Sequence, residues 1–217
     1  MARTLTLTLS VALTLWLAAA SFAQAQASAP AFKEGDTWQF KFETKNAIKS
    51  LTDSAAGTYE IVFTQGNIKL YETEGGRGRG GEIPITNDIL SQTLLTQVGK
   101  NEQQILKFPL SVGQKWSYKY TYASMRSGRF GTSGQNREVQ VNVIGMEDVT
   151  TPAGTFKTFK LVRVEGYFAG ARGGNYARET YTYFYSPDTK SVVKISSVND
   201  NDPVIQEGEL IKFTPGS

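Results

Sequence analysis

Through most of the chain after residue 30, apolar side chains occupy every second position and polar side chains lie between them. This is the pattern of a β-strand with one buried face. In the first such segment, Trp38, Phe40 and Phe42 fall on the same face of the predicted strand. The pattern recurs to the C-terminus, and it predicts ten strands at residues 35–42, 58–64, 67–73, 103–108, 116–122, 138–146, 156–165, 180–186, 191–198 and 204–213. The fold is therefore predicted to be mostly β.

Short turns separate most of these strands. The turn-forming residues are Gln65-Gly66, Thr151-Pro152-Ala153-Gly154-Thr155, Pro187-Asp188 and the run 199–203. Parallel strands would need long crossover helices, and only one short helix is predicted, over 87–98, where Asn87 and Asp88 can cap an apolar stripe. We therefore expect an antiparallel meander.

An internal echo connects two of the predicted strands. Residues 35–42 and 113–120 both read Gly-x-x-Trp-x-aromatic-Lys-aromatic. A duplication would give two related halves, about 30–107 and 108–213, of one curved sheet shaped as a half-barrel or open barrel; convergence of two aromatic-rich strands is the alternative. On the duplication hypothesis, Trp38 and Trp116 should be the least exposed aromatic residues.

Composition adds several exclusions. The 217 residues are enough for one core, so 26–217 is predicted to be a single domain. The sequence has no Cys and no His, which excludes disulfides, thiol nucleophiles, Ser-His relays and ordinary zinc, copper or haem sites. We expect no metal and no cofactor. Beyond residue 25 the chain has 22 basic and 20 acidic residues, which does not indicate a nucleic-acid partner.

The first 25 residues have the features of a cleaved signal peptide. Arg3 precedes an apolar segment, residues 5–20, and small residues surround a predicted cleavage site after Ala25, with Ala23 and Ala27 as alternatives. The segment is shorter than a membrane anchor and is interrupted by Thr and Ser. No lipoprotein Cys follows it, and no second apolar run could span a bilayer. The mature protein is expected in the periplasm or outside the cell.

Three motifs in the second half resemble a known group of exported bacterial proteins. They are the segment 108–116 (Phe-Pro-Leu-x-x-Gly-x-x-Trp), the Pro152-Ala153-Gly154-Thr155-Phe156 turn, and Tyr185-Ser186-Pro187-Asp188 before a C-terminal Glu209-Leu210 strand. These residues are similar to the TapB-like family, a domain of unknown function, over roughly 108–213. The resemblance implies a curved antiparallel sheet or half-barrel in the cell envelope, and it supplies no catalytic residues.

Two sets of residues are candidates for ligand binding. Arginines in glycine-rich loops, which suit anionic groups unless they are only solvated hairpin tips, are Arg77, Arg79, Arg129 and Arg172. Aromatic stripes, which suit an apolar or glycan ligand on a concave sheet unless they form the core, are Trp116, Tyr118, Tyr120, Tyr181, Tyr183 and Tyr185.

Carboxylates offer two weaker hypotheses. Asp200 and Asp202 lie in a run that resembles a calcium-binding linker, but two carboxylates are few for calcium and the run also suits a turn. Glu165 and Glu179 flank a predicted hairpin and have the residue types of a glycosidase pair.

The sequence thus predicts a non-catalytic exported binding protein. Its ligand would be a hydrophobic or amphipathic molecule, such as a lipid or glycan, or a segment of an envelope protein, held on the concave face of the sheet. The alternatives are a cell-envelope structural or assembly factor acting through its sheet edges and a carboxylate-dependent hydrolase.

Overall fold

The computed structural model describes residues 25–46, 56–74, 82–83, 105–124, 133–168, 176–200 and 202–217. Within these ranges the chain forms twelve strands and no helix. No helix there is long and apolar enough to cross a membrane. The predicted helix at 87–98 lies outside the described residues, as do the four candidate loop arginines.

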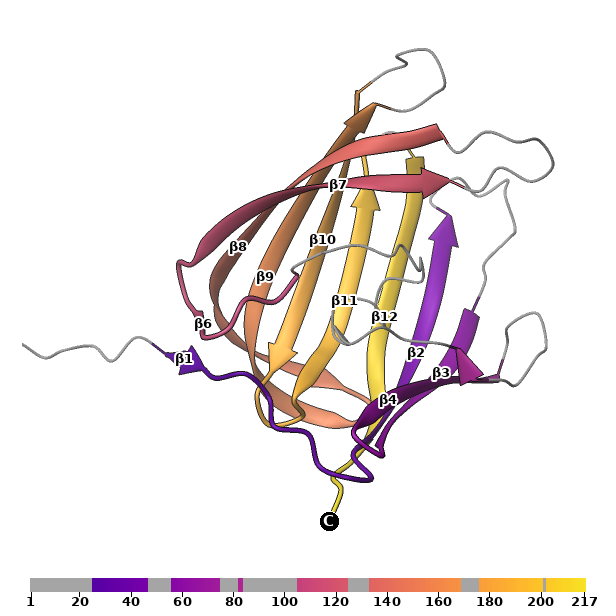
Figure 1. The fold of residues 1–217 in the computed structure, drawn as a ribbon, viewed down its shortest axis with the longest axis vertical. Coiled ribbons are helices and arrows are strands. Elements are labelled where there is room, and N and C mark those ends of the chain that lie inside the picture. The colour runs from indigo at the N-terminus through magenta and orange to yellow at the C-terminus, as the bar shows by residue number, and fades with distance from the viewer. Residues whose placement is uncertain are drawn as a thin grey trace, which may run out of the picture.

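Ten strands form one antiparallel sheet that curves strongly around its long axis (Figure 1). Their order across the sheet is β5-β4-β3-β2-β12-β11-β10-β9-β8-β7. The strands are β2 (Thr37–Asn46), β3 (Ala56–Thr64), β4 (Asn67–Glu74), β5 (Glu82–Ile83), β7 (Lys115–Ser124), β8 (Ser133–Thr151), β9 (Gly154–Phe168), β10 (Tyr176–Ser186), β11 (Ser191–Asn199) and β12 (Asp202–Thr214). The predicted curved antiparallel sheet is therefore confirmed.

Two meanders make up this sheet. The first runs from β2 to β5 and the second from β7 to β12, and they meet where β2 pairs with β12. Among the described strands, β5 and β7 end the sheet without pairing to each other. The two strands of the internal echo thus occupy different places, since β2 lies inside the sheet and β7 at its end. The origin of the halves by duplication stays a prediction.

A separate two-stranded sheet joins β1 (Gln26–Ala27) to β6 (Leu110–Ser111). The segment before β6 was predicted to be a strand over 103–108, but residues 105–109 are not in a strand. They pack on the concave face instead, because Ile105 is fully buried there and the Phe108 ring meets the Tyr185 ring edge-on at 5.5 Å.

The hairpin of β8 and β9 is longer than predicted and bends under the ends of β11 and β12 (Figure 1). A bulge between Val143 and Gly145 interrupts its register. At its tip, Gly154 has φ of +135°, and the Ala153 N–H donates to the Leu210 carbonyl of β12 at 3.3 Å. The motif that carries the family resemblance therefore forms a hairpin tip fixed against the C-terminal strand.

Trp38 lies near the centre of the core. It is 2% exposed, its indole N–H donates to the Thr189 carbonyl at 2.6 Å, and its ring meets Phe32 edge-on and stacks on Phe213. Tyr183 and Tyr185 are fully buried and so less exposed than Trp38, and Trp116 is only partly buried. The expectation that the two tryptophans are the least exposed aromatic residues is therefore wrong, most clearly for Trp116. The reason is its position on β7, which has a paired neighbour on one side only among the described strands.

A buried carboxylate connects the turn before β2 with the C-terminal tail. Asp36 accepts hydrogen bonds from the Lys33 N–H at 2.7 Å, the Gly216 N–H at 2.8 Å and the Lys190 ammonium at 2.6 Å. A Cβ on Gly216 would lie 2.1 Å from the Glu34 carbonyl oxygen, so only glycine fits. The N-terminal turn, the β10–β11 turn and the C-terminal tail thus share one acceptor.

The burial of the two tryptophans predicts unequal effects of mutation. Trp38→Ala should lower the free energy of unfolding by about 3–5 kcal/mol, because a buried ring and a buried hydrogen bond are lost. Trp116→Ala should cost clearly less, because part of that ring is in solvent already. Urea denaturation of the mature chain measures both changes. Equal losses would contradict the assigned difference in burial.

The stability should depend on the charge of Asp36. Burial alone raises the pKa of Asp36, but hydrogen bonds from Gly216, Lys190 and Lys33 outweigh burial and hold this pKa below its ordinary value of 3.8. A lowered folded pKa contributes stability above pH 3.8, and this contribution is lost as the pH falls through the folded pKa. Asp36→Asn should therefore destabilise the protein by about 1–3 kcal/mol at pH 7 and by less at pH 3.

Urea midpoints at the two pH values measure this effect. Asp188→Asn is the control, because Asp188 is exposed in the same β10–β11 turn that carries Lys190. A loss that is the same for both variants, or independent of pH, would contradict the role assigned to Asp36.

Candidate functional site

Along the strands of the second meander, the concave face changes from apolar to polar. On β9, Phe159 and Leu161 are followed at the same phase by Arg163 and Glu165. The register places Val141 of β8 and Tyr181 of β10 on either side of Arg163. The apolar end of the face is the core described above, and the other end holds a polar cluster.

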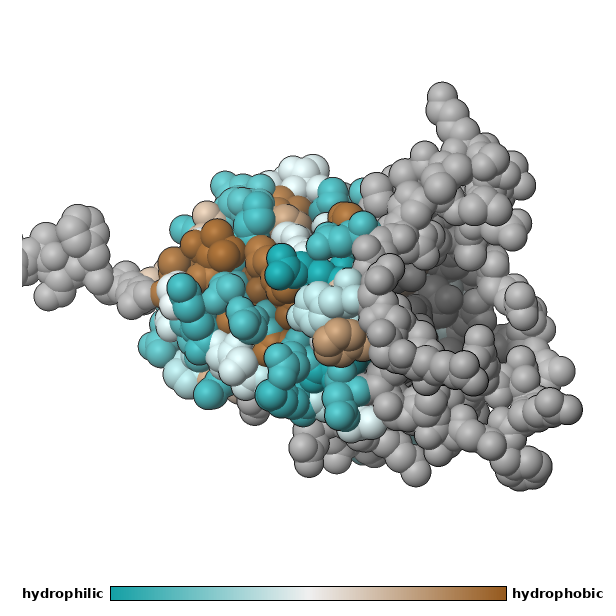
Figure 2. Space-filling view, turned by 90° about the horizontal axis from the view of Figure 1, so that it is seen from above, coloured by the Kyte–Doolittle hydropathy of each residue, from teal (hydrophilic) through white to brown (hydrophobic). Residues whose placement is uncertain are grey.

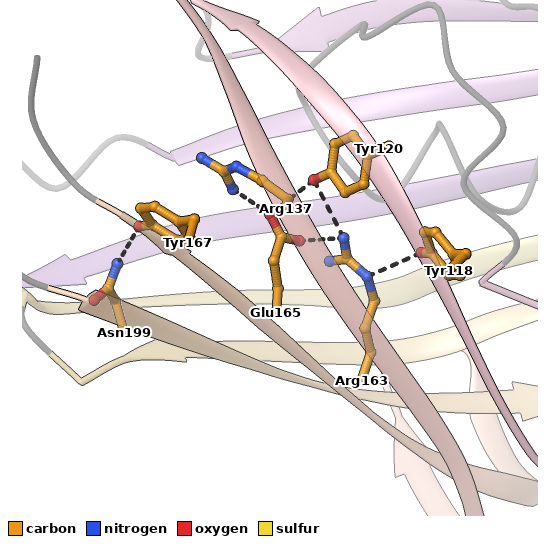
Figure 3. A network of polar contacts seen from close by, with 7 residues as sticks. All are labelled: Tyr118, Tyr120, Arg137, Arg163, Glu165, Tyr167 and Asn199. Carbon is orange, nitrogen blue, oxygen red and sulfur yellow. Dashed lines mark hydrogen bonds and ion pairs between the residues drawn. The ribbon is translucent and has the colours of Figure 1, made fainter. Parts of the chain in front are cut away.

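Glu165 is the centre of this cluster (Figure 3). One of its carboxylate oxygens pairs with the Arg137 guanidinium and the other with the Arg163 guanidinium. The Tyr120 hydroxyl donates to the first of these oxygens at 2.7 Å. The side chains of Glu165 and Arg163 are each 1% exposed. Both carboxylate oxygens are therefore used inside the protein.

Aromatic residues surround both guanidinium groups. Arg163 donates to the Tyr118 hydroxyl at 3.2 Å and to the Tyr120 hydroxyl at 3.4 Å, and its guanidinium lies 4.7 Å from the centre of the Tyr181 ring. Arg137 lies 4.0 Å from the centre of the Tyr167 ring, whose hydroxyl accepts from Asn199 at 3.1 Å. These contacts hold both arginines in fixed orientations.

The surroundings determine the charges in the cluster. Burial opposes the charged form of Arg137 and Arg163, yet the pKa of both lies above the ordinary value. Glu165 raises the pKa of Arg137, and Tyr183 and Glu165 raise the pKa of Arg163. Burial raises the pKa of the Tyr120 hydroxyl, which stays neutral. Burial also raises the pKa of Glu179, which lies directly opposite Glu165 in the register. Two fixed positive charges therefore face the single carboxylate that bridges them.

One hydroxyl beside the cluster lacks a regular hydrogen bond. Tyr183 is fully buried next to Arg163, and no hydrogen bond of regular length and angle joins its hydroxyl to a described residue. The same holds for the Tyr185 hydroxyl, farther along β10. Buried donors of this kind are uncommon in folded proteins.

The predicted aromatic residues divide into two groups. Tyr183 and Tyr185 belong to the core, the alternative that the sequence left open for the stripe. Four others remain partly exposed along the concave face, namely Trp116, Tyr118, Tyr120 and Tyr181. The loop residues Arg77, Arg79, Arg129 and Arg172 lie outside the described residues, so their grouping stays a prediction.

Sequence reasoning missed Arg137 and Arg163. The sequence did contain a signal for them, because both arginines stand at positions that the period-two alternation assigns to the buried face. Arg137 lies two residues before Val139 and four before Val141, and Arg163 lies two residues after Leu161. A charged residue at a position that the alternation assigns to the buried face is a candidate for a functional or structural ion pair.

The carboxylate hypotheses fare differently. Glu165 and Glu179 do face each other across β9 and β10, but both carboxylate oxygens of Glu165 are engaged by guanidinium groups. Asp200 is exposed after β11. Over the part of the chain that the structure describes, no three acidic side chains come together as a metal site.

Comparisons with family models and with curated proteins gave no match. Two solved structures are similar. One is a "putative lipoprotein" of Parabacteroides distasonis, with a TM-score of 0.43 and 12% identity, covering 88% of this chain and all of the other. The second is a "putative exported protein with YmcC-like fold" of Bacteroides fragilis, with a TM-score of 0.39 and 12% identity, covering 87% of this chain and 99% of the other. At these scores neither likeness assigns a function, and the TapB-like resemblance stays a prediction.

The ion pairs predict a strong effect of neutralising Glu165. Glu165→Gln should destabilise the protein by about 3–5 kcal/mol, because two buried guanidinium groups lose their counter-charge. Glu138→Gln is the matched control, since Glu138 pairs with Lys119 in solvent and should cost less than about 1 kcal/mol. Urea denaturation compares the two variants, and similar losses would show that the Glu165 pairs do not carry this energy.

Proposed function

We propose that this protein is an exported, non-catalytic binding protein that holds an amphipathic ligand on the concave face of its sheet. The observation that carries this proposal is the row of partly exposed aromatic residues, Trp116, Tyr118, Tyr120 and Tyr181, beside a buried charged cluster. Export rests on the signal-peptide pattern of the first 25 residues.

The composition of this face supports binding over a purely structural role. A buried ion pair contributes little net stability compared with apolar residues of the same size. Apolar residues at Arg137, Arg163 and Glu165 would continue the core that begins at Leu161. A face with aromatic surface next to a few oriented polar groups is typical of ligand sites.

The two alternative functions lack such support. A hydrolase needs a carboxylate free to accept a proton or attack substrate, and both oxygens of Glu165 are engaged. An assembly factor would use a sheet edge, but β7 carries Lys115 and Lys119 as exposed residues, and lysines on an end strand oppose strand addition.

Native mass spectrometry of gently purified mature protein tests the proposal, because a bound amphiphile should appear as added mass. Titration with dodecyl-chain amphiphiles should change the emission of Trp116, and this change should disappear in Trp116→Phe while Trp38 still emits. Tyr118→Ala should weaken binding by at least about tenfold, which corresponds to about 1.4 kcal/mol.

Ser117→Ala is the matched control, because Ser117 lies on the opposite, exposed face of the same strand. Its affinity should equal that of the wild type. If no added mass is found and no dodecyl amphiphile binds, the proposed function is wrong.

A further inference from the structure

The first described strand begins one residue after the predicted cleavage site of the signal peptide. β1 consists of Gln26 and Ala27, which pair with Ser111 and Leu110 of β6 in antiparallel register. Ala25, immediately before β1, is exposed and lies outside any strand. Because a chain end is poorly ordered unless pairing or packing fixes it, this pairing indicates that residues 26 and 27 belong to the folded domain.

Ala27 is part of the hydrophobic core, whereas its neighbour Gln26 is not. Ala27 is 5% exposed and lies in the same apolar cluster as Ile105 and Leu110, which are fully buried. Gln26 is exposed, so its side chain reaches solvent at the start of β1. Loss of Ala27 would remove a buried side chain and would leave Leu110 without its strand partner.

The structure therefore distinguishes the three cleavage positions that the sequence left open. Cleavage after Ala27 would remove the whole of β1 together with a core residue. Cleavage after Ala25 would keep β1 intact and would make Gln26 the first residue of the mature chain. Ala23 and Ala25 supply the two small residues that this position requires. Cleavage after Ala23 would also spare β1, but it would leave two residues before the strand.

We infer that the mature protein begins at Gln26 and that this residue is cyclised to pyroglutamate. In this step the α-amine of Gln26 attacks the carbonyl carbon of its own side-chain amide, a lactam ring forms, and the amide nitrogen leaves as ammonia. The reaction is an amide exchange within one residue, so it needs no oxidant, reductant or second substrate. The exposure of Gln26 leaves space for the ring at the start of β1.

Cyclisation would protect the short strand that precedes the rest of the fold. An aminopeptidase needs a free α-amine, and the removal of two residues from an unmodified terminus would take away Ala27. The lactam also replaces a charged ammonium group by a neutral amide, as other terminal modifications do. This inference shares with the proposed function only the premise of export, and it is independent of the ligand.

Intact mass spectrometry tests the cleavage site and the modification together. The full-length chain is produced in a Gram-negative host, and the protein is purified from the periplasm and measured again after prolonged incubation at neutral pH. The mass should equal that of residues 26–217 less one ammonia. A chain that begins at Gln24 or Ser28 would show that the assigned cleavage site is wrong. A mass of residues 26–217 that never loses ammonia would show that Gln26 is not cyclised.

Two glutamine variants locate the ring. Gln26→Ala should give a mature chain of the same length that keeps its α-amine and loses no ammonia. Gln24→Ala is the matched control, because residue 24 would be removed with the signal peptide and the loss of ammonia should be unchanged. A loss of ammonia that persists in Gln26→Ala, or that disappears in Gln24→Ala, would overturn the inference.

The outcomes also separate this inference from the proposed function. A different first residue, or a free amine on Gln26, overturns the inference alone, because the protein would still be exported. If the signal peptide stays on the chain and no protein reaches the periplasm, both the inference and the exported role fail.

Discussion

The pairing of β2 with β12 is the contact on which the shape of this protein depends. It joins the first meander to the last strand of the second, and so makes one curved sheet from two that could not each bury a core. Asp36 reinforces this junction because it binds the C-terminal tail and the β10–β11 turn at the same time. Curvature gives the sheet an inner face, and every residue of the candidate site lies on it. The site therefore depends on the pairing of β2 with β12, which joins the two meanders into one curved sheet.

The inner face divides into an apolar and a polar end because each strand changes composition along its length. β9 runs from Leu161 to Arg163 and Glu165, and β11 from Ile195 to Ser197 and Asn199. At the apolar end the segment 105–111 and the β8–β9 hairpin cover the core. At the polar end guanidinium and phenol groups replace aliphatic side chains, and ion pairs and ring contacts hold them in place.

Period-two alternation made the strands and their antiparallel order predictable, including the Gln65-Gly66 hairpin, where both residues have positive φ. Alternation predicts which face of the sheet a residue occupies, but it does not predict which strands are neighbours. The expected burial of Trp116 was therefore wrong, because β7 lies at the end of the sheet. The predicted strand at 103–108 failed for a related reason. Its apolar residues pack against the inner face of the sheet without forming a strand. The sequence pattern shows which positions are buried, but it does not show whether they are buried by such packing or by pairing with a neighbouring strand. Arg137 and Arg163 could have been found, since each breaks an apolar phase, whereas their partners depend on register.

The polarity of the inner face bears on how a ligand would lie there. Figure 2 shows that hydrophilic residues cover much of the described surface seen from above, with hydrophobic patches between them. Along β7 the inner face becomes more polar from Trp116 through Tyr118 to Tyr120. Trp116 offers apolar ring surface, whereas the Tyr120 hydroxyl contacts Glu165 and Arg163. A molecule with one apolar and one charged end matches this order in a single direction, because reversing it would bury the charge against the core and leave the arginines facing a hydrocarbon chain. These charged residues add little stability compared with apolar residues of the same size. They would instead specify the orientation of the ligand, which gives a physical reason for their place in a strand that could have remained apolar.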